Sequence, residues 1–139
     1  MKIFNKISFL IIILTVLLAL QISGCSRTKN LISPVVVAIP SSVSDKSITR
    51  AIKNASIKRK WLPYDEKEGV ISVRLEVRDH IVEVDIEYEE TKIRIVYRDS
   101  ENMLYEEKDD GTILIHKKYN VWVKNLRQDI QLNLAKIEE

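Results

Sequence analysis

Two polar stretches in the second half of the chain hold the side chains best suited to chemistry. They supply a carboxylate, hydroxyls, carboxamides and an imidazole: Asp99, Ser100, Asn102, His116, Tyr119 and Asn120. A serine, a histidine and an aspartate within hydrogen-bond reach of one another can perform nucleophilic catalysis. Neither a nucleophile-elbow motif nor a glycine-rich oxyanion loop accompanies Ser100, however.

We therefore interpret these residues as structural. Asp99 and Asn102 suit an Asx-type turn, and His116 suits the first turn of a helix. The alternative is a hydrolytic or ligand-binding site built from four of them: Asp99, Asn102, His116 and Asn120. The two histidines, His80 and His116, fall on separate predicted elements without further ligands at the spacing of a zinc site. We expect no metal ion and no other cofactor.

The single cysteine of the chain, Cys25, has the most informative surroundings. It ends a stretch that begins with two lysines, continues through an apolar run and closes on small residues: Lys2, Lys6, Ile7 to Leu20, and Ile22-Ser23-Gly24. This order resembles the lipobox of a bacterial lipoprotein signal peptide. The resemblance implies cleavage between Gly24 and Cys25, a diacylglyceryl group (palmitate or similar chains) on the Cys25 thiol, and attachment of the mature protein to a membrane.

An uncleaved transmembrane anchor is the competing interpretation of the same residues. Ile7 to Ile22 is 16 residues, or about 24 Å of helix, which is short of the roughly 30 Å hydrocarbon core. In lipoproteins of this kind an aspartate after the cysteine is read as an inner-membrane retention signal, and here Ser26 follows. In a two-membraned bacterium we expect the inner leaflet of the outer membrane, facing the periplasm, and otherwise the outer face of the plasma membrane.

Removal of residues 1–24 changes the charge of the chain. Both charged residues in that segment are lysines, so the 22 basic side chains fall to 20 and equal the 20 acidic ones. A net charge near zero gives no general attraction to nucleic acid or to anionic lipid. We expect a signal peptide over 1–24, the lipidated cysteine and a tether over 25–43, and a single domain over 44–139.

The expected tether is rich in serine, threonine and asparagine and contains Pro34 and Pro40. An apolar run over 35–39 interrupts it and is compatible with an extra edge strand. Beyond it, Ser44 is placed as the N-cap of a helix from about Asp45 to Arg59, and Pro63 prevents its continuation. Basic residues coat this helix; we interpret them as a solvated face, with phosphate or lipid-headgroup binding as the alternative.

Alternating apolar and polar residues predict three half-buried strands, over 71–77, 82–88 and 93–98. Two-residue turns at Asp79-His80 and Glu90-Thr91 would join them into an antiparallel meander. This register predicts three opposite-charge neighbours on the open face: Arg74 with Asp85, Glu87 with Arg94, and Glu83 with Arg98. We interpret the charges as a solvated ladder and not as a carboxylate active site.

The last predicted element is a helix that begins near Leu114 or His116, with an apolar stripe that places Trp122 in the core. The sequence therefore predicts an α+β fold of the order helix, three-stranded antiparallel meander, helix. Two layers result, with both helices on one face of the sheet.

Two blocks of sequence within Trp61 to Ile130 carry a further resemblance: 97–105 (YRDSENMLY) and 115–126 (IHKKYNVWVKNL). They resemble a group of small bacterial envelope lipoproteins of undetermined function. The resemblance implies export and a single domain but transfers no mechanism. We expect a non-enzymatic binding or scaffolding component of the cell envelope, with another envelope protein as its partner and no nucleic acid. The alternative is a small periplasmic hydrolase or ligand-binding protein that uses the Asp99/His116 region.

Overall fold

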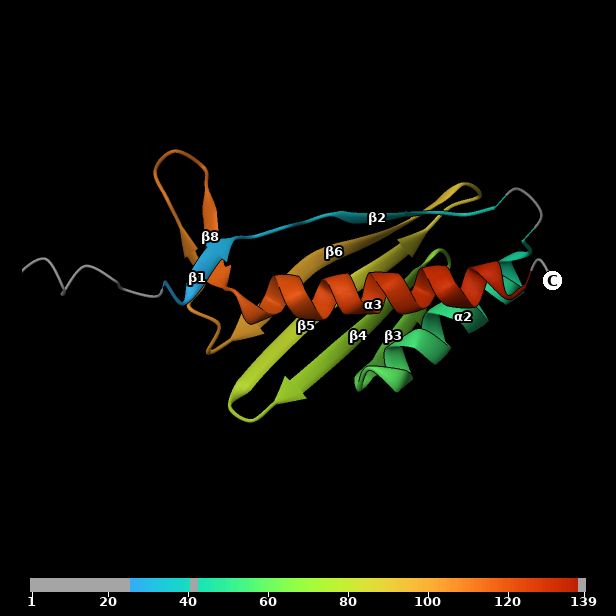
Figure 1. Cartoon of the computed structure of the whole chain (residues 1–139), viewed down its shortest axis with the longest axis horizontal. Helices are drawn as coiled ribbons and strands as arrows, with labels where there is room; N and C mark the ends of the chain where they lie inside the picture. Colours follow the sequence, from blue (N-terminus) through green and yellow to red (C-terminus); the bar gives the residue numbers. More distant parts are fainter. Residues whose placement is uncertain (1–25, 41–42, 138–139) are drawn as a thin grey trace, which may run out of the picture.

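The computed structural model describes residues 26–40 and 43–137, so the predicted cleavage and lipidation at Gly24 and Cys25 lie outside the described residues. Two helices and eight strands are described (Figure 1). In chain order they are β1 (Thr28–Asn30), β2 (Val35–Ala38), α2 (Asp45–Lys58), β3 (Trp61–Lys67), β4 (Val70–Val77), β5 (His80–Tyr88), β6 (Lys92–Glu101), β7 (Glu106–Glu107), β8 (Ile113–His116) and α3 (Lys118–Ala135).

The larger sheet has five antiparallel strands in the order β2-β6-β5-β4-β3. Both helices cover the same face of it (Figure 1). Alternate residues of the strands point into the space beneath the helices, so Val73, Val84 and Ile95 are fully buried there. They belong to one apolar core that also contains Ile52 of α2 and Leu126 of α3.

The prediction of a three-stranded meander was therefore wrong, since the fold is mostly β. Strand β3 pairs with β4 at one edge of the sheet, and β2 pairs with β6 at the other. Pro63 lies in β3 and has no backbone N–H to donate. An edge strand tolerates this because one side of it pairs with no other strand. A register irregularity between Pro63 and Asp65 breaks the alternation that would have identified this strand. The edge strand proposed for the 35–39 run is confirmed as β2.

A second sheet, of order β1-β8-β7, was not predicted at all. Its central strand β8 occupies Ile113–His116, so the last helix does not begin at Leu114 or His116 but at Lys118. Strand β1 pairs with β8 and places Thr28 opposite His116. Residues expected to form a tether thus contribute β1 and β2, and β1 begins three residues after Cys25.

The register of β4 on β5 is shifted by two residues from the predicted one. The turn is Arg78-Asp79, with Arg78 at φ 56°, and Arg74 lies opposite Glu83 rather than Asp85. A two-residue shift leaves every side chain on its original face, so the apolar pattern alone does not distinguish the two registers. The predicted pairing of Glu87 with Arg94 is confirmed.

The third predicted pair, Glu83 with Arg98, does not form because a bulge interrupts the pairing of β5 with β6. The register changes between Glu83 and Val84, and Glu83 lies opposite Asp99 instead of Arg98. Arg98 is the extra residue on β6 at this bulge, and it forms an ion pair with Asp85 instead.

Helix α2 forms as expected. Ser44 is the N-cap, and its side chain accepts a hydrogen bond from the backbone N–H of Ser47. The prediction that Trp122 lies in the core was wrong: Trp122 is only partly buried against it, whereas Trp61 is 1 % exposed and belongs to the core. No helix among the described residues combines the length and the apolar character of a membrane span.

A buried carboxylate ties the two helices together. Asp129 of α3, 3 % exposed, accepts hydrogen bonds from Lys58 (3.1 Å) and from Arg59. The Arg59 guanidinium, and to a smaller extent Lys58, hold the pKa of this carboxyl below its usual value against the opposing effect of burial. The pair fixes the end of α2 against the middle of α3.

Candidate functional site

The first candidate site is the junction between β6 and α3, where the sequence placed its polar groups. Asp99 accepts a hydrogen bond from the backbone N–H of Ser100 at 2.7 Å, but both residues belong to β6, so the Asx-type turn predicted at Asp99 does not form. The hydroxyl of Ser100 pairs with that of Tyr97 at 2.8 Å. Neither contact involves His116, so the described hydrogen bonds do not assemble a serine, histidine and aspartate triad.

Asn102 joins the loop after β6 to the turn between β4 and β5. It has φ 56°, a conformation that asparagine adopts more easily than most residues. Its side-chain amide donates to the carbonyl of Asp79 at 2.8 Å, and its own carbonyl accepts from Nδ1 of His80 at 2.7 Å. These contacts give Asn102 a structural role at this end of the sheet.

His80 and His116 lie side by side, although they come from different strands. Their ring centroids are 5.2 Å apart, and the ring of Trp122 lies 6.3 Å from that of His80. Nδ1 of His116 accepts the backbone N–H of Lys118 at 3.3 Å, which places the proton of the neutral ring on Nε2. Burial, followed by the nearby His80 and three cationic residues, lowers the pKa of His116. The rings of the two histidines are inclined to each other by 31°, and the lowered pKa favours the neutral form of His116 at neutral pH.

Asn120 and Tyr119, the remaining candidates, have clear packing roles. The Asn120 side chain bridges the backbone of the segment between β1 and β2, donating to the carbonyl of Asn30 (2.8 Å) and accepting from the N–H of Ile32 (3.1 Å). Tyr119 is fully buried and packs edge-on against Tyr97, with centroids 5.6 Å apart. Burial raises the pKa of the Tyr119 hydroxyl well above its usual value.

The structure thus brings Asn102, His80 and His116 to one end of the molecule without completing catalytic machinery. Within the described residues no group of three or more histidine, cysteine, aspartate or glutamate side chains is arranged to hold a metal ion. The sequence missed the contact between the two histidines because it depends on β8 returning beside the start of β5. A strand assignment for Ile113–His116 would have been needed to find it.

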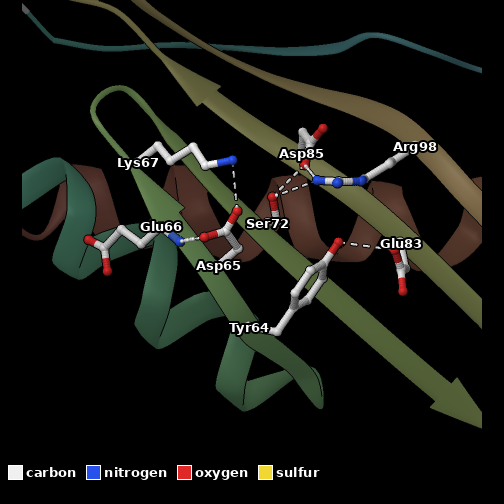
Figure 2. Close-up of polar contacts among 8 residues, drawn as sticks. All are labelled: Tyr64, Asp65, Glu66, Lys67, Ser72, Glu83, Asp85 and Arg98. Carbon is white, nitrogen blue, oxygen red and sulfur yellow. Dashed lines mark hydrogen bonds and ion pairs between the residues drawn. The ribbon is translucent and has the colours of Figure 1, made fainter.

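The second candidate is the open face of the five-stranded sheet, where two carboxylates lie among polar partners (Figure 2). Glu83 accepts hydrogen bonds from the Tyr64 hydroxyl and from Arg74, each at 3.0 Å. Arg74 also binds Glu76 at 2.7 Å. Burial and the bond to Glu83 raise the pKa of Tyr64, so its hydroxyl stays protonated near neutral pH.

Asp85 has an equally complete set of partners. It accepts from the Ser72 hydroxyl at 2.6 Å and from Arg98 at 3.0 Å, and Figure 2 shows the three side chains converging. The Arg98 guanidinium also lies over the ring of Tyr64, 5.9 Å from its centroid. Each carboxylate is thus paired with a cation, which makes the network a charge ladder on the open face and not a pair of unequal carboxylates poised for acid–base work.

Two surface grooves lie beside the helices and the sheet. The first, about 490 Å³, lies between β2 and α3 and is lined mostly by apolar side chains with two basic ones: Ile32, Pro34, Val35, Val36, Asn120, Val121, Lys124 and Arg127. The second, about 580 Å³, lies beside the charge ladder and is lined by Ile57, Lys60, Leu62, Pro63, Tyr64, Arg74 and Glu76. Neither groove includes Asp99, Asn102 or His116.

Charge is strongly segregated along the chain. Residues 43–60, which contain α2, carry six basic and one acidic side chain, and residues 117–139, which contain α3, carry five basic and three acidic. Residues 61–116, which contain six of the strands, carry seven basic and sixteen acidic. The near-zero net charge expected for residues 25–139 therefore combines basic helical segments with an acidic segment that contains six of the strands.

A scan against protein-family models matches none of them, and searches of curated proteins and of solved structures likewise find no match.

Proposed function

We propose that this protein is a lipid-anchored component of the bacterial cell envelope with a non-enzymatic binding or scaffolding role. The observation that carries the proposal is the short distance along the chain between Cys25 and the fold. Strand β1 begins at Thr28, and three residues of extended chain span at most about 10 Å. An acyl group on Cys25 would therefore hold the domain directly against the membrane surface.

The geometry of the two candidate sites supports a binding role over catalysis. Polar groups of the β6–α3 junction bond to nearby backbone groups or contact a neighbouring ring, and Glu83 and Asp85 are each paired with an arginine. Meanwhile the surface offers open grooves and the exposed edge of β2. Such shallow surfaces suit a macromolecular partner better than a small substrate.

The first prediction concerns the anchor. When cells are fed an alkyne-bearing palmitate, the wild-type protein should become labelled, whereas Cys25→Ser should remain unlabelled and unprocessed. Ser26→Ala, next to the cysteine, is the matched control and should label like wild type. An intact mass of the wild-type protein with an unmodified Cys25 thiol would contradict the anchor. Recovery with inner-membrane fractions would contradict only the assignment to the outer membrane.

The second prediction separates this function from a hydrolase or ligand-binding protein that uses the Asp99/His116 region. His116→Gln retains a polar side chain but removes the group able to exchange protons near neutral pH. We expect this variant to fold, to melt close to the wild-type temperature and to complement a deletion strain. A variant that folds normally yet fails to complement would favour a working site at His116.

A further inference from the structure

Helix α3 and the residue before it form hydrogen bonds with residues 27–36. The backbone N–H of Lys117 donates to the carbonyl of Arg27 at 2.9 Å, Asn120 bridges Asn30 and Ile32, and Nε of Arg127 donates to the carbonyl of Val36 at 3.0 Å. Residues 27–36 therefore run beside α3, and four of them line the groove between β2 and α3: Ile32, Pro34, Val35 and Val36. In Figure 1, β1, β8 and the start of α3 gather at the same end of the molecule.

The surface formed in this way has two kinds of exposed side chain. Three large apolar residues are about half exposed on it: Ile32 at 54 %, Val36 at 48 % and Val121 at 48 %. Four cationic residues are exposed along the same segments of chain: Arg27, Lys29, Lys118 and Lys124. Exposed apolar side chains bordered by basic ones are the combination by which peripheral proteins bind anionic membranes. We call these seven residues the anchor-side surface.

The position of this surface relative to Cys25 identifies its occupant. Thr28 is at most about 10 Å of extended chain from the cysteine, so the lipid that the proposed function places on Cys25 brings the bilayer within reach of Arg27 and Lys29. We propose that the anchor-side surface docks on a bilayer containing anionic phospholipid and sets the orientation of the domain on it. This inference rests on the proposed acylation of Cys25.

Charge favours an anionic bilayer as the occupant of this surface. The anchor-side surface contains four cationic residues and no acidic one, and an anionic bilayer attracts these cations over about one Debye length, roughly 8–10 Å. The open face of the large sheet lies opposite the helices, and its carboxylates Glu83, Asp85 and Glu87 are paired with arginines. With the anchor-side surface on the bilayer, the charge ladder and Tyr64 would face away from the membrane, towards a partner.

The test uses the full lipidated chain reconstituted into vesicles. An environment-sensitive dye is attached at Val121→Cys on the anchor-side surface or at Leu62→Cys on the open face of the sheet, where the native side chain is 64 % exposed. With nitroxide-labelled lipid present, the dye at position 121 should be quenched several-fold more in phosphatidylglycerol-containing vesicles than in phosphatidylcholine vesicles. The dye at position 62 should respond equally weakly to both. High salt should remove the difference at position 121 without any mutation.

A matched pair of charge variants tests whether the anchor-side surface causes the difference in quenching at position 121. Replacing Arg27, Lys29, Lys118 and Lys124 together by glutamine should abolish the difference at position 121. Replacing four other exposed cations, Lys46, Arg50, Lys60 and Lys67, removes the same charge and should leave most of it. Equal losses in both variants, or equal quenching in both kinds of vesicle, would overturn the anchor-side surface. Flotation with either kind of vesicle reports the acyl anchor separately, so its loss counts against the proposed function itself.

Discussion

Trp61→Ala is expected to lower the free energy of unfolding by about 3–5 kcal/mol, a large part of the stability of a small domain. The Trp61 side chain is 1 % exposed and lies in the core between β3 and the helices, so its removal leaves a cavity that neighbouring residues refill only in part. Chemical denaturation followed by far-ultraviolet circular dichroism measures the loss.

Two controls test the placement of the core. Trp122→Ala removes a ring of the same size that is only partly buried, and it should cost about 1–2 kcal/mol. Glu87→Ala on the open face, where Glu87 is paired with Arg94 at 3.3 Å and both are more than a third exposed, should cost about 0–1 kcal/mol. If Trp122→Ala were as costly as Trp61→Ala, the core would extend to the face of α3 that carries Trp122.

Local features of the sequence were sufficient for helix α2 and for the faces of β4, β5 and β6. Serine is a favoured N-cap residue, so Ser44 marks the start of α2, and apolar residues such as Ile48 and Ile52 recur at helical spacing after it. Residues close together in the sequence are therefore enough to predict this helix. Alternation likewise determined which side chains of β5 are buried, and Val84 and Ile86 are fully buried. These elements depend little on distant parts of the chain.

The missed strands depend on distant partners. Strand β3 contains Pro63 and a register irregularity, and it is stable because it pairs with β4 at a sheet edge. Strand β8 is a short apolar run directly before a helix, and its sequence extends the apolar stripe of α3 without a visible break. Its identity as a strand comes from pairing with Thr28–Asn30, more than eighty residues away. Periodicity within a short window carries no information about such partners.

The same limit applies to the candidate site. The Asx turn predicted at Asp99 was wrong, because β6 continues through this residue to Glu101 in its pairing with β5. The contact between the rings of His80 and His116 and the role of Asn120 as a bridge to Asn30 and Ile32 were missed, since both require the second sheet. The contribution of the 26–40 segment to the fold therefore changes where a membrane would meet the domain.

Asp129→Asn is the other substitution with a large expected effect. Asp129 is 3 % exposed and accepts hydrogen bonds from Lys58 and Arg59, so the amide would lose both ion pairs and leave the buried position less well satisfied. We expect a loss of about 1–3 kcal/mol at neutral pH. Asp109→Asn, in the exposed loop between β7 and β8, is the matched control and should change stability little.

The pH dependence of this loss provides a second, independent readout. The folded protein holds the pKa of Asp129 below its unfolded value, chiefly through the hydrogen bond from Arg59. Its stabilising contribution is therefore complete above the unfolded pKa, about pH 4, and is lost as the pH falls through the lower folded pKa. Denaturation of wild type and Asp129→Asn at about pH 7 and about pH 2 should show the gap between them narrowing in acid. A gap that stays constant would mean that the two helices are joined by packing and not by this carboxylate, because a protonated Asp129 can no longer form an ion pair with Lys58 or Arg59.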